Sequence, residues 1–364
     1  MTLSTERTEI HSPTRLNRRR FVQGAAVTGV AVAITACAPV APRPRAEDAP
    51  AALDDAPTIS AAPARGRVAR VRTDDRSEGL RRLLAMAGPL AVAGKQVVVK
   101  PNFNSADPAP GSTHPDILRG VVRSLHDGGA SQIVVTDRSG MGNTRQVMAQ
   151  LGVDRMAEEM DFDLVVLDEL PAEAWALVDF RGSHWVQGFL FPKFVTEAGA
   201  IVQLCCLKTH RFGGHFTLSL KNSVGLAAKF LPGDPYNYMN ELHGSAFQRT
   251  MIAEINTAYR PDLVVMDGVE AFVSGGPDRG EKVAANVMLA GADRVALDAV
   301  GVALLRYFGA ASPVSTGAVF AQEQIARAVE LDLGVSSPDQ IDLLSDDDAG
   351  AALAAELEAI LHAA

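Results

Sequence analysis

The segment 204–225 contains the residue types that carry out chemistry in proteins. An apolar run typical of a buried strand ends at Lys208 and His210, and the apolar segment after the next glycine turn carries Lys221 and Asn222. Burying an ammonium group is unfavourable unless an anion or another acceptor contacts it. The segment therefore predicts a pocket for a negatively charged ligand or a metal ion. Alternatively, both lysines extend to the surface and the histidine makes an ordinary loop hydrogen bond.

Charged and amide side chains also follow other predicted strands. These groups are Lys100 and Asn102 after the strand 96–99, Asp137 after the strand 133–136, and Asp267 after the strand 263–266. Ligands of open α/β sheets bind beyond the carboxyl ends of the strands, so we expect these groups to converge with those of the segment 204–225. For the two aspartates the alternative is a turn cap, a common role of this residue type.

The elements that position these groups follow from the apolar pattern. Runs of strand length alternate with helical periodicity, which predicts an α/β fold: a mostly parallel sheet with helices on both faces, as a single large domain or two closely packed lobes. Strands are predicted at 96–99, 133–136, 164–167, 200–207, 263–266 and 287–289, and helices at 115–125, 247–259, 294–307 and 320–331. We expect this domain to occupy residues 66–348, followed by a C-terminal helical tail at 349–364.

The N-terminus has the pattern of an export signal. Residues 17–23, NRRRFVQ, match the twin-arginine motif, and the weakly hydrophobic run 24–36 is shorter than the about 20 apolar residues of a membrane span. The run ends in Ile-Thr-Ala before Cys37, the form of a lipobox whose cysteine is lipidated. We expect residues 1–36 to be a twin-arginine lipoprotein signal peptide. The alternative is a soluble exported protein with a chance cysteine.

Export and lipidation would determine the location and partners of the mature chain. The twin-arginine export machinery would translocate it already folded, and lipid on Cys37 would hold it to a membrane on the periplasmic or extracytoplasmic side. Residues 37–65 are rich in Ala, Pro and Asp and predict a flexible linker.

Charge and cysteine content exclude several classes of function. The formal net charge is -9 and no stripe of Lys and Arg is present, which argues against nucleic acid as a partner. No C-x-x-C spacing occurs, so neither an iron–sulfur cluster nor a zinc knuckle is expected. Cys205 and Cys206 are adjacent within a predicted buried strand, and we expect free thiols because a vicinal disulfide is strained.

Several motifs together resemble one family, the domain of unknown function 362, over roughly residues 94–344. They are VKPN at 99–102, THPD at 113–116, GASQIVVTD at 129–137, LKTH at 207–210, LKNSVG at 220–225, His243, the segment 262–268, GGP at 275–277 with Gly280, and GADRVALDA at 291–299. The resemblance implies an α/β domain with a polar site built from these motifs, but no established reaction. Some relatives carry a ferredoxin-like segment with four cysteines, which this chain lacks. Arg294 stands where proline is common.

The motifs supply the candidate site residues. Catalytic candidates are Lys100, Lys208, His210 and Lys221; ligand-binding candidates are Asn102, Asn222, Asp137, Asp267 and Gly276; and metal-binding candidates are His114 and His243. Lysines would hold carboxylate or phosphate oxygens, amides would orient the ligand, and imidazoles transfer protons near neutral pH. A lysine with a lowered pKa is also a candidate base or Schiff-base nucleophile. Asp298 is explained as well by an ion pair with Arg294 as by catalysis.

Three functions remain open from the sequence. The first is an enzyme acting on a small anionic metabolite by acid–base chemistry, and the second is a metal-dependent version of it. The third is a non-catalytic lipoprotein that binds an anion or a metal ion and assists a membrane redox system. The sequence does not identify a cofactor.

Overall fold

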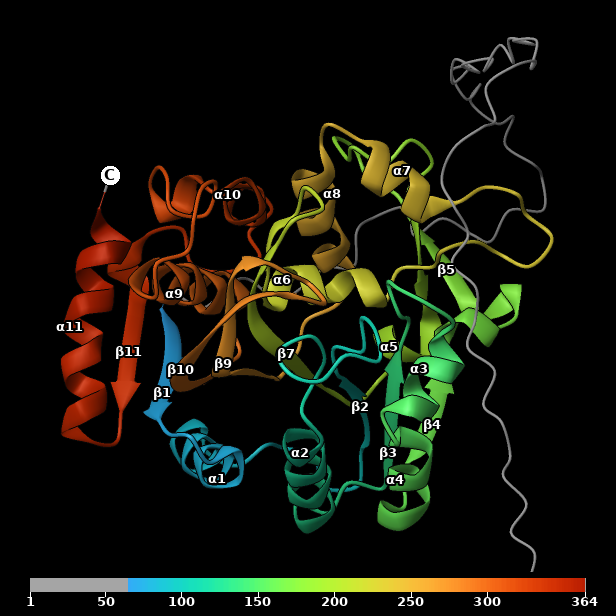
Figure 1. Cartoon of the computed structure of the whole chain (residues 1–364). Coiled ribbons are helices and arrows are strands. Elements are labelled where there is room, and N and C mark those ends of the chain that lie inside the picture. Colours follow the sequence, from blue (N-terminus) through green and yellow to red (C-terminus); the bar gives the residue numbers. More distant parts are fainter. Residues whose placement is uncertain (1–64, 364) are drawn as a thin grey trace, which may run out of the picture. The chain divides into compact units, whose positions relative to one another are not determined.

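The computed structural model describes residues 65–363, whose strands form one large sheet and one small one (Figure 1). The large sheet contains β1 (Gly66–Arg72), β2 (Gln96–Lys100), β3 (Gln132–Asp137), β4 (Asp163–Val166), β7 (Ala200–His210), β8 (His215–Thr217), β9 (Leu263–Gly275), β10 (Gly280–Gly291) and β11 (Ile341–Ser345). The small antiparallel sheet pairs β5 (Trp175–Val178) with β6 (Phe189–Pro192).

The large sheet is mostly parallel, as predicted. Its order is β11-β1-β10-β9-β7-β2-β3-β4, with β8 paired to β7. The five neighbours β9, β7, β2, β3 and β4 are parallel, whereas β10 is antiparallel to both β9 and β1. The α/β fold class is therefore confirmed.

The helices connect these strands. They are α1 (Arg76–Ala87), α2 (Pro115–Asp127), α3 (Thr144–Gln150), α4 (Val153–Met160), α5 (Lys193–Thr196), α6 (Ser219–Asn222), α7 (Tyr238–Gly244), α8 (Gln248–Ile255), α9 (Arg294–Tyr307), α10 (Glu323–Glu330) and α11 (Asp348–His362). Short 3₁₀ turns lie at η1 (Leu167–Glu169), η2 (Ala172–Ala174), η3 (Ser223–Gly225), η4 (Asn256–Ala258), η5 (Val319–Ala321) and η6 (Pro338–Gln340).

Alternating side chains of the central strands face two different groups of helices. In β7, Val202 and Leu204 pack with apolar side chains of α1 to α4, whereas Cys205 and Leu207 pack with those of α6 and α8 to α11. This period of two is the geometry of a strand buried on both faces. The C-terminal helix α11 belongs to the second group, because Leu353 and two further leucines of it are buried there.

The chain reverses direction across the sheet between β2 and β7. From β2 it runs through α2 to β3 and then to β4 on one side, whereas from β7 it runs through α6 to α8 to β9 on the other side. Such a switch point leaves a crevice beyond the carboxyl ends of the two central strands. Lys100 ends β2 and His210 ends β7, so the fold brings motifs 110 positions apart to one edge.

Several elements differ in extent from their predictions. β9 and β10 are longer than the predicted strands 263–266 and 287–289, because they continue as a hairpin with two register shifts. The predicted helix 247–259 is α8 followed by η4, and the predicted helix 320–331 is shortened to α10. The expectations for residues 1–36, Cys37 and most of the linker 37–65 lie outside the described residues. Within residues 65–363, no helix has the length and apolar character needed to cross a membrane.

Candidate functional site

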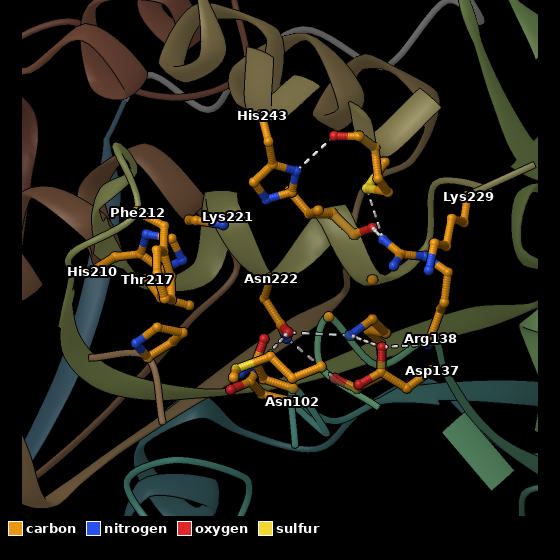
Figure 2. A pocket seen from close by; sticks show the side chains of 18 residues that line it. Asn102, Asp137, Arg138, His210, Phe212, Thr217, Lys221, Asn222, Lys229 and His243 are labelled. Carbon is orange, nitrogen blue, oxygen red and sulfur yellow. Dashed lines mark hydrogen bonds and ion pairs between the residues drawn. The ribbon is translucent and has the colours of Figure 1, made fainter. Parts of the chain in front are cut away.

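A cavity of about 550 Å³ opens at the switch point between β2 and β7 (Figure 2). Its walls come from the ends of β2 and β3, the β7–β8 hairpin, the segment from α6 to η3, and α7. The polar lining residues are Lys100, Asn102, Asn104, Asp137, Arg138, His210, Thr217, Lys221, Asn222, Lys229 and His243. Met141, Phe212, Val224 and Met239 add apolar surface.

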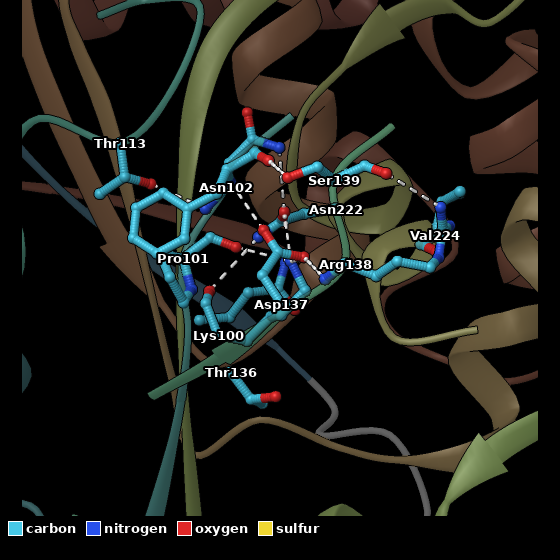
Figure 3. A network of polar contacts seen from close by, with 12 residues as sticks. Lys100, Pro101, Asn102, Thr113, Thr136, Asp137, Arg138, Ser139, Asn222 and Val224 are labelled. Atoms are coloured by element: carbon cyan, nitrogen blue, oxygen red, sulfur yellow. Dashed lines mark hydrogen bonds and ion pairs between the residues drawn. The ribbon is translucent and has the colours of Figure 1, made fainter. Parts of the chain in front are cut away.

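The floor of the cavity holds a buried ion pair between the ends of β2 and β3 (Figure 3). Lys100 Nζ lies 2.8 Å from Asp137 Oδ1, and the carboxylate also accepts hydrogen bonds from the backbone N–H groups of Phe103 and Arg138. Burial opposes both charges, so it lowers the pKa of Lys100 and raises that of Asp137. Gly225 completes the packing, because a Cβ there would lie 2.2 Å from Asp137 Oδ1.

Two asparagines connect this pair to a second buried lysine. Asn222 Oδ1 accepts hydrogen bonds from Lys100 Nζ at 3.1 Å and from Asn102 Nδ2 at 3.3 Å. Asn102 Oδ1 in turn accepts from Lys208 Nζ at 2.8 Å. Four residues from β2, its following loop, β7 and α6 thus form one continuous network of hydrogen bonds.

Lys208 is fully buried behind the cavity and has a complete set of acceptors. Besides Asn102 Oδ1, its ammonium group donates to the carbonyl oxygens of Gly111 and Pro277, the latter at 3.1 Å. An ammonium group has three N–H donors, so none is left for a ligand. Lys208, predicted as catalytic, therefore acts as a clamp that holds two loops around the site, the loop 101–114 and the turn of the β9–β10 hairpin.

Lys221 is the buried lysine without an acceptor. Within residues 65–363 its ammonium group has neither a hydrogen bond nor an ion pair, although its side chain lines the cavity. Burial, together with the positive charges of Lys208 and Arg138, lowers its pKa to about 8. A substantial fraction of Lys221 is therefore neutral at mildly alkaline pH.

Two histidines border the same space (Figure 2). His243 Nδ1 lies 2.7 Å from the carbonyl oxygen of Met239, so this nitrogen carries the proton and Nε2 is the acceptor. Burial lowers the pKa of His243, and burial together with Lys221 lowers that of His210 well below its usual value. Both imidazoles are therefore neutral at pH 7 and can accept a proton.

Several buried polar atoms of the lining side chains have no hydrogen-bond partner within the described residues. They are His210 Nδ1, Thr217 Oγ1 and Asn104 Nδ2. Buried polar atoms in folded proteins are nearly always paired, and leaving one unpaired costs about 1–3 kcal/mol. Their presence around one cavity indicates a place for a polar ligand or for water.

The sequence prediction omitted Arg138. Its guanidinium is buried and donates to the carbonyl oxygens of Ala227 and Val224, but no carboxylate lies within 4.0 Å of it in the described part of the chain. Its position directly after Asp137 at a strand end was the available signal. Lys229 and Phe212, also omitted, lie at the exposed side of the cavity.

Besides Lys208, three predicted site residues do not line the cavity. Asp267 forms a 2.7 Å ion pair with Arg76 of α1, and His114 caps α2 by accepting from the N–H group of Asp116. Gly276 has a positive φ of 65° and packs against the Thr209 carbonyl, so its role is in the turn of the β9–β10 hairpin. Among residues 65–363, no three His, Cys, Asp or Glu side chains are grouped as metal ligands would be.

Asp298 does not line the cavity, and among the described residues it forms no ion pair with Arg294 within 4.0 Å. It accepts hydrogen bonds from the backbone N–H groups of Ser219 at 2.7 Å and Leu220 at 3.0 Å, and so fixes the start of α6. Burial raises its pKa to about 6. Cys205 and Cys206 are buried free thiols, as expected, and burial raises the pKa of Cys206 to about 11.

The motifs that line the cavity lie within a recognised family region. The sequence profile described as "Domain of unknown function (DUF362)" matches residues 97–303, more than half of the chain. The chain belongs to this family. It is 24% identical over 268 residues to the thylakoid-associated protein sll1697 of Synechocystis sp., with 70% of this chain and 76% of that protein covered.

One solved structure shows a distant likeness. The lactate racemase apoprotein from Thermoanaerobacterium thermosaccharolyticum is similar with a TM-score of 0.36 and 18% sequence identity, over 57% of this chain and 51% of the racemase. The chain thus matches about half of the racemase's length.

Proposed function

We propose that this protein is an enzyme that binds a small anionic metabolite in the cavity at the switch point and transforms it by proton transfer. The observation that carries the proposal is the excess of buried positive charge. Lys221 and Arg138 line the cavity and Lys208 lies behind it, and in the described chain the charged group of each has no carboxylate within 4.0 Å. An anion is the partner that such uncompensated charges favour.

The roles of the residues follow from their contacts. Lys208, Asn102, Asn222 and Lys100 use their polar atoms on one another, so they form a rigid frame. The N–H groups of Lys221 Nζ have no acceptor among the described residues and are available to the ligand. His243 Nε2 is an acceptor without a partner in the described chain, His210 Nδ1 has no partner there either, and both neutral imidazoles serve as bases. Because the frame is already ordered, little conformational entropy is lost when the ligand binds.

Binding and turnover are tested on the same protein. Thermal unfolding is measured with a panel of small carboxylates and phosphates, and each mixture that stabilises the protein is then analysed for products by mass spectrometry. We expect saturable stabilisation by at least one carboxylate or phosphate, lost in Lys221→Met and kept in Lys282→Met, which changes an exposed lysine outside the cavity. Absence of stabilisation by every anion contradicts the proposal. Stabilisation without product favours the non-catalytic anion-binding alternative.

We further propose that the protein is an exported lipoprotein held to a membrane by lipid on Cys37. The support is the twin-arginine motif followed by the lipobox, and the relative sll1697 is described as thylakoid-associated. Membrane fractionation of cells expressing the full chain tests this proposal. We expect Cys37→Ala to release the exported protein from the membrane fraction, and Arg18→Lys with Arg19→Lys to prevent export. Membrane association that survives Cys37→Ala contradicts lipid anchoring.

A further inference from the structure

Of the four lysines at or beside the cavity, Lys221 alone is both buried and without acceptors. Lys100 Nζ contacts Asp137 Oδ1, Asn222 Oδ1 and the carbonyl oxygen of Pro101, and Lys208 Nζ is equally saturated. Lys229 is exposed at the mouth. A nucleophilic amine needs an unprotonated nitrogen with its lone pair available, which three acceptors around an ammonium group prevent. Lys221 is the lysine that meets this requirement.

The surroundings of Lys221 favour its neutral form. Lys208 and Arg138 place positive charge beside it, and the buried carboxylate that lines the cavity, that of Asp137, is already paired with Lys100. Cationic neighbours and burial activate lysine as a nucleophile, since both disfavour the ammonium form. The site thus combines buried positive charges, which favour an anionic group, with one amine that loses its proton readily.

Proton carriers lie next to this amine. A Cβ on residue 214 would lie 2.6 Å from Lys221 Cε and 2.9 Å from His210 Nδ1, so the glycine allows the lysine and the imidazole to approach each other. This His210 nitrogen has no partner among the described residues. His243, with Nε2 as an acceptor, lies on the other side of Lys221 in Figure 2.

We propose that Lys221 forms a covalent imine with the carbonyl carbon of a 2-oxo acid bound in the cavity. This inference rests on the proposed anion-binding function and adds the substrate class. In a 2-oxo acid the carboxylate and the reactive carbonyl are directly bonded. An anion held by the field of Lys208 and Arg138 therefore keeps its carbonyl close to the amine.

The reaction balances without any further reagent. The neutral amine nitrogen attacks the carbonyl carbon, and one proton moves from nitrogen to oxygen through a neighbouring imidazole to give the carbinolamine. A second proton follows the same path as the C–O bond breaks, so one water leaves and one C=N bond remains. The imine takes up a proton from solvent to become the iminium cation, which withdraws electrons from the adjacent carbon.

Reductive trapping tests the inference. The full-length protein is incubated with sodium cyanoborohydride and, separately, pyruvate, 2-oxobutyrate, 2-oxoglutarate or phenylpyruvate, and the adduct is located by peptide mass mapping. We expect a single adduct on Lys221 with at least one acid and none on Lys229 in the same digest. Lys221→Met should abolish trapping, whereas Lys282→Met, at an exposed lysine outside the cavity, should leave it unchanged.

Binding is measured in parallel, so that the two proposals can fail separately. No Lys221 adduct with any of the four acids, or labelling spread over the exposed lysines, overturns the inference. If the acids still stabilise wild-type protein against heat in that case, the result supports anion binding and contradicts only the formation of the imine. If neither these acids nor any other anion stabilises the protein, the proposed function is contradicted as well.

Discussion

Lys208 and Lys221 lie in one buried polar region, yet their ammonium groups are in opposite situations. Lys208 Nζ donates to three oxygens, whereas Lys221 Nζ contacts no acceptor among residues 65–363. The positive charge of Lys208 lowers the pKa of Lys221. One lysine therefore stabilises the fold, and the other is held in an unfavourable state that a ligand can relieve. Because of this contrast, we expect replacement by methionine to change the free energy of unfolding in opposite directions at the two lysines.

Lys221→Met should stabilise the protein at pH 7. Methionine has a similar length and no charge, so the variant removes a buried ammonium group without removing any hydrogen bond. Lowering the pKa from 10.5 to about 8 corresponds to a cost of up to about 3 kcal/mol for the charged form. We expect a higher free energy of unfolding in denaturant titrations together with loss of ligand binding. A destabilised variant would mean that Lys221 has an acceptor in solution.

Lys208→Met should destabilise the protein. It leaves Asn102 Oδ1 and the carbonyl oxygens of Gly111 and Pro277 buried without their donor, at about 1–3 kcal/mol each. Relief of the buried charge offsets part of this loss, so we expect a net decrease of about 2 kcal/mol in the free energy of unfolding. Lys282→Met is the matched control, because this exposed lysine forms only a surface ion pair with Glu270. An unchanged stability would contradict the clamp role.

The stability of the wild-type protein should depend on alkaline pH in a defined way. Below pH 8 Lys221 is charged in both the folded and the unfolded state, and above pH 10.5 it is neutral in both. The cost of its buried charge in the folded state is therefore fully present below pH 8 and is lost as the pH rises to 10.5. Between these values the unfolded chain binds more protons, and the free energy of unfolding contributed by this group rises with pH. The measurement is the difference between wild type and Lys221→Met from pH 7 to 10.5. A constant difference would show that the pKa is not lowered.

Gly225→Ala should break the buried ion pair at the floor of the cavity. The added Cβ would lie 2.2 Å from Asp137 Oδ1 and 2.9 Å from Lys100 Nζ, so the two side chains cannot keep their positions. Separating a buried pair costs about 3–5 kcal/mol, which sets the expected loss of stability in thermal or denaturant unfolding. Gly244→Ala is the control, because a Cβ on this residue would have no described atom within 4 Å. Equal stability of the two variants would contradict this role of Gly225.

Much of the fold could be predicted from local sequence patterns. Apolar runs of strand length and helical periodicity placed most of the sheet, because strand and helix periods are local properties. The rule that parallel strands present their carboxyl ends at one edge correctly brought Lys100, Asp137 and His210 together. The same reasoning placed Asp267 in the site, and there it was wrong. β9 continues past this residue, and Arg76 of α1 pairs with it.

The sequence by itself determined which residue types gather at the edge of the sheet, since strand ends and polar motifs are encoded locally. Only the tertiary structure decided their roles. Most hydrogen bonds of the Lys208 ammonium group go to the backbone carbonyl oxygens of Gly111 and Pro277. The buried guanidinium of Arg138 likewise donates to the carbonyl oxygens of Val224 and Ala227. Every residue type carries a backbone carbonyl, so no residue pattern reveals where one will point. That is why the sequence could not distinguish the clamping lysine from Lys221.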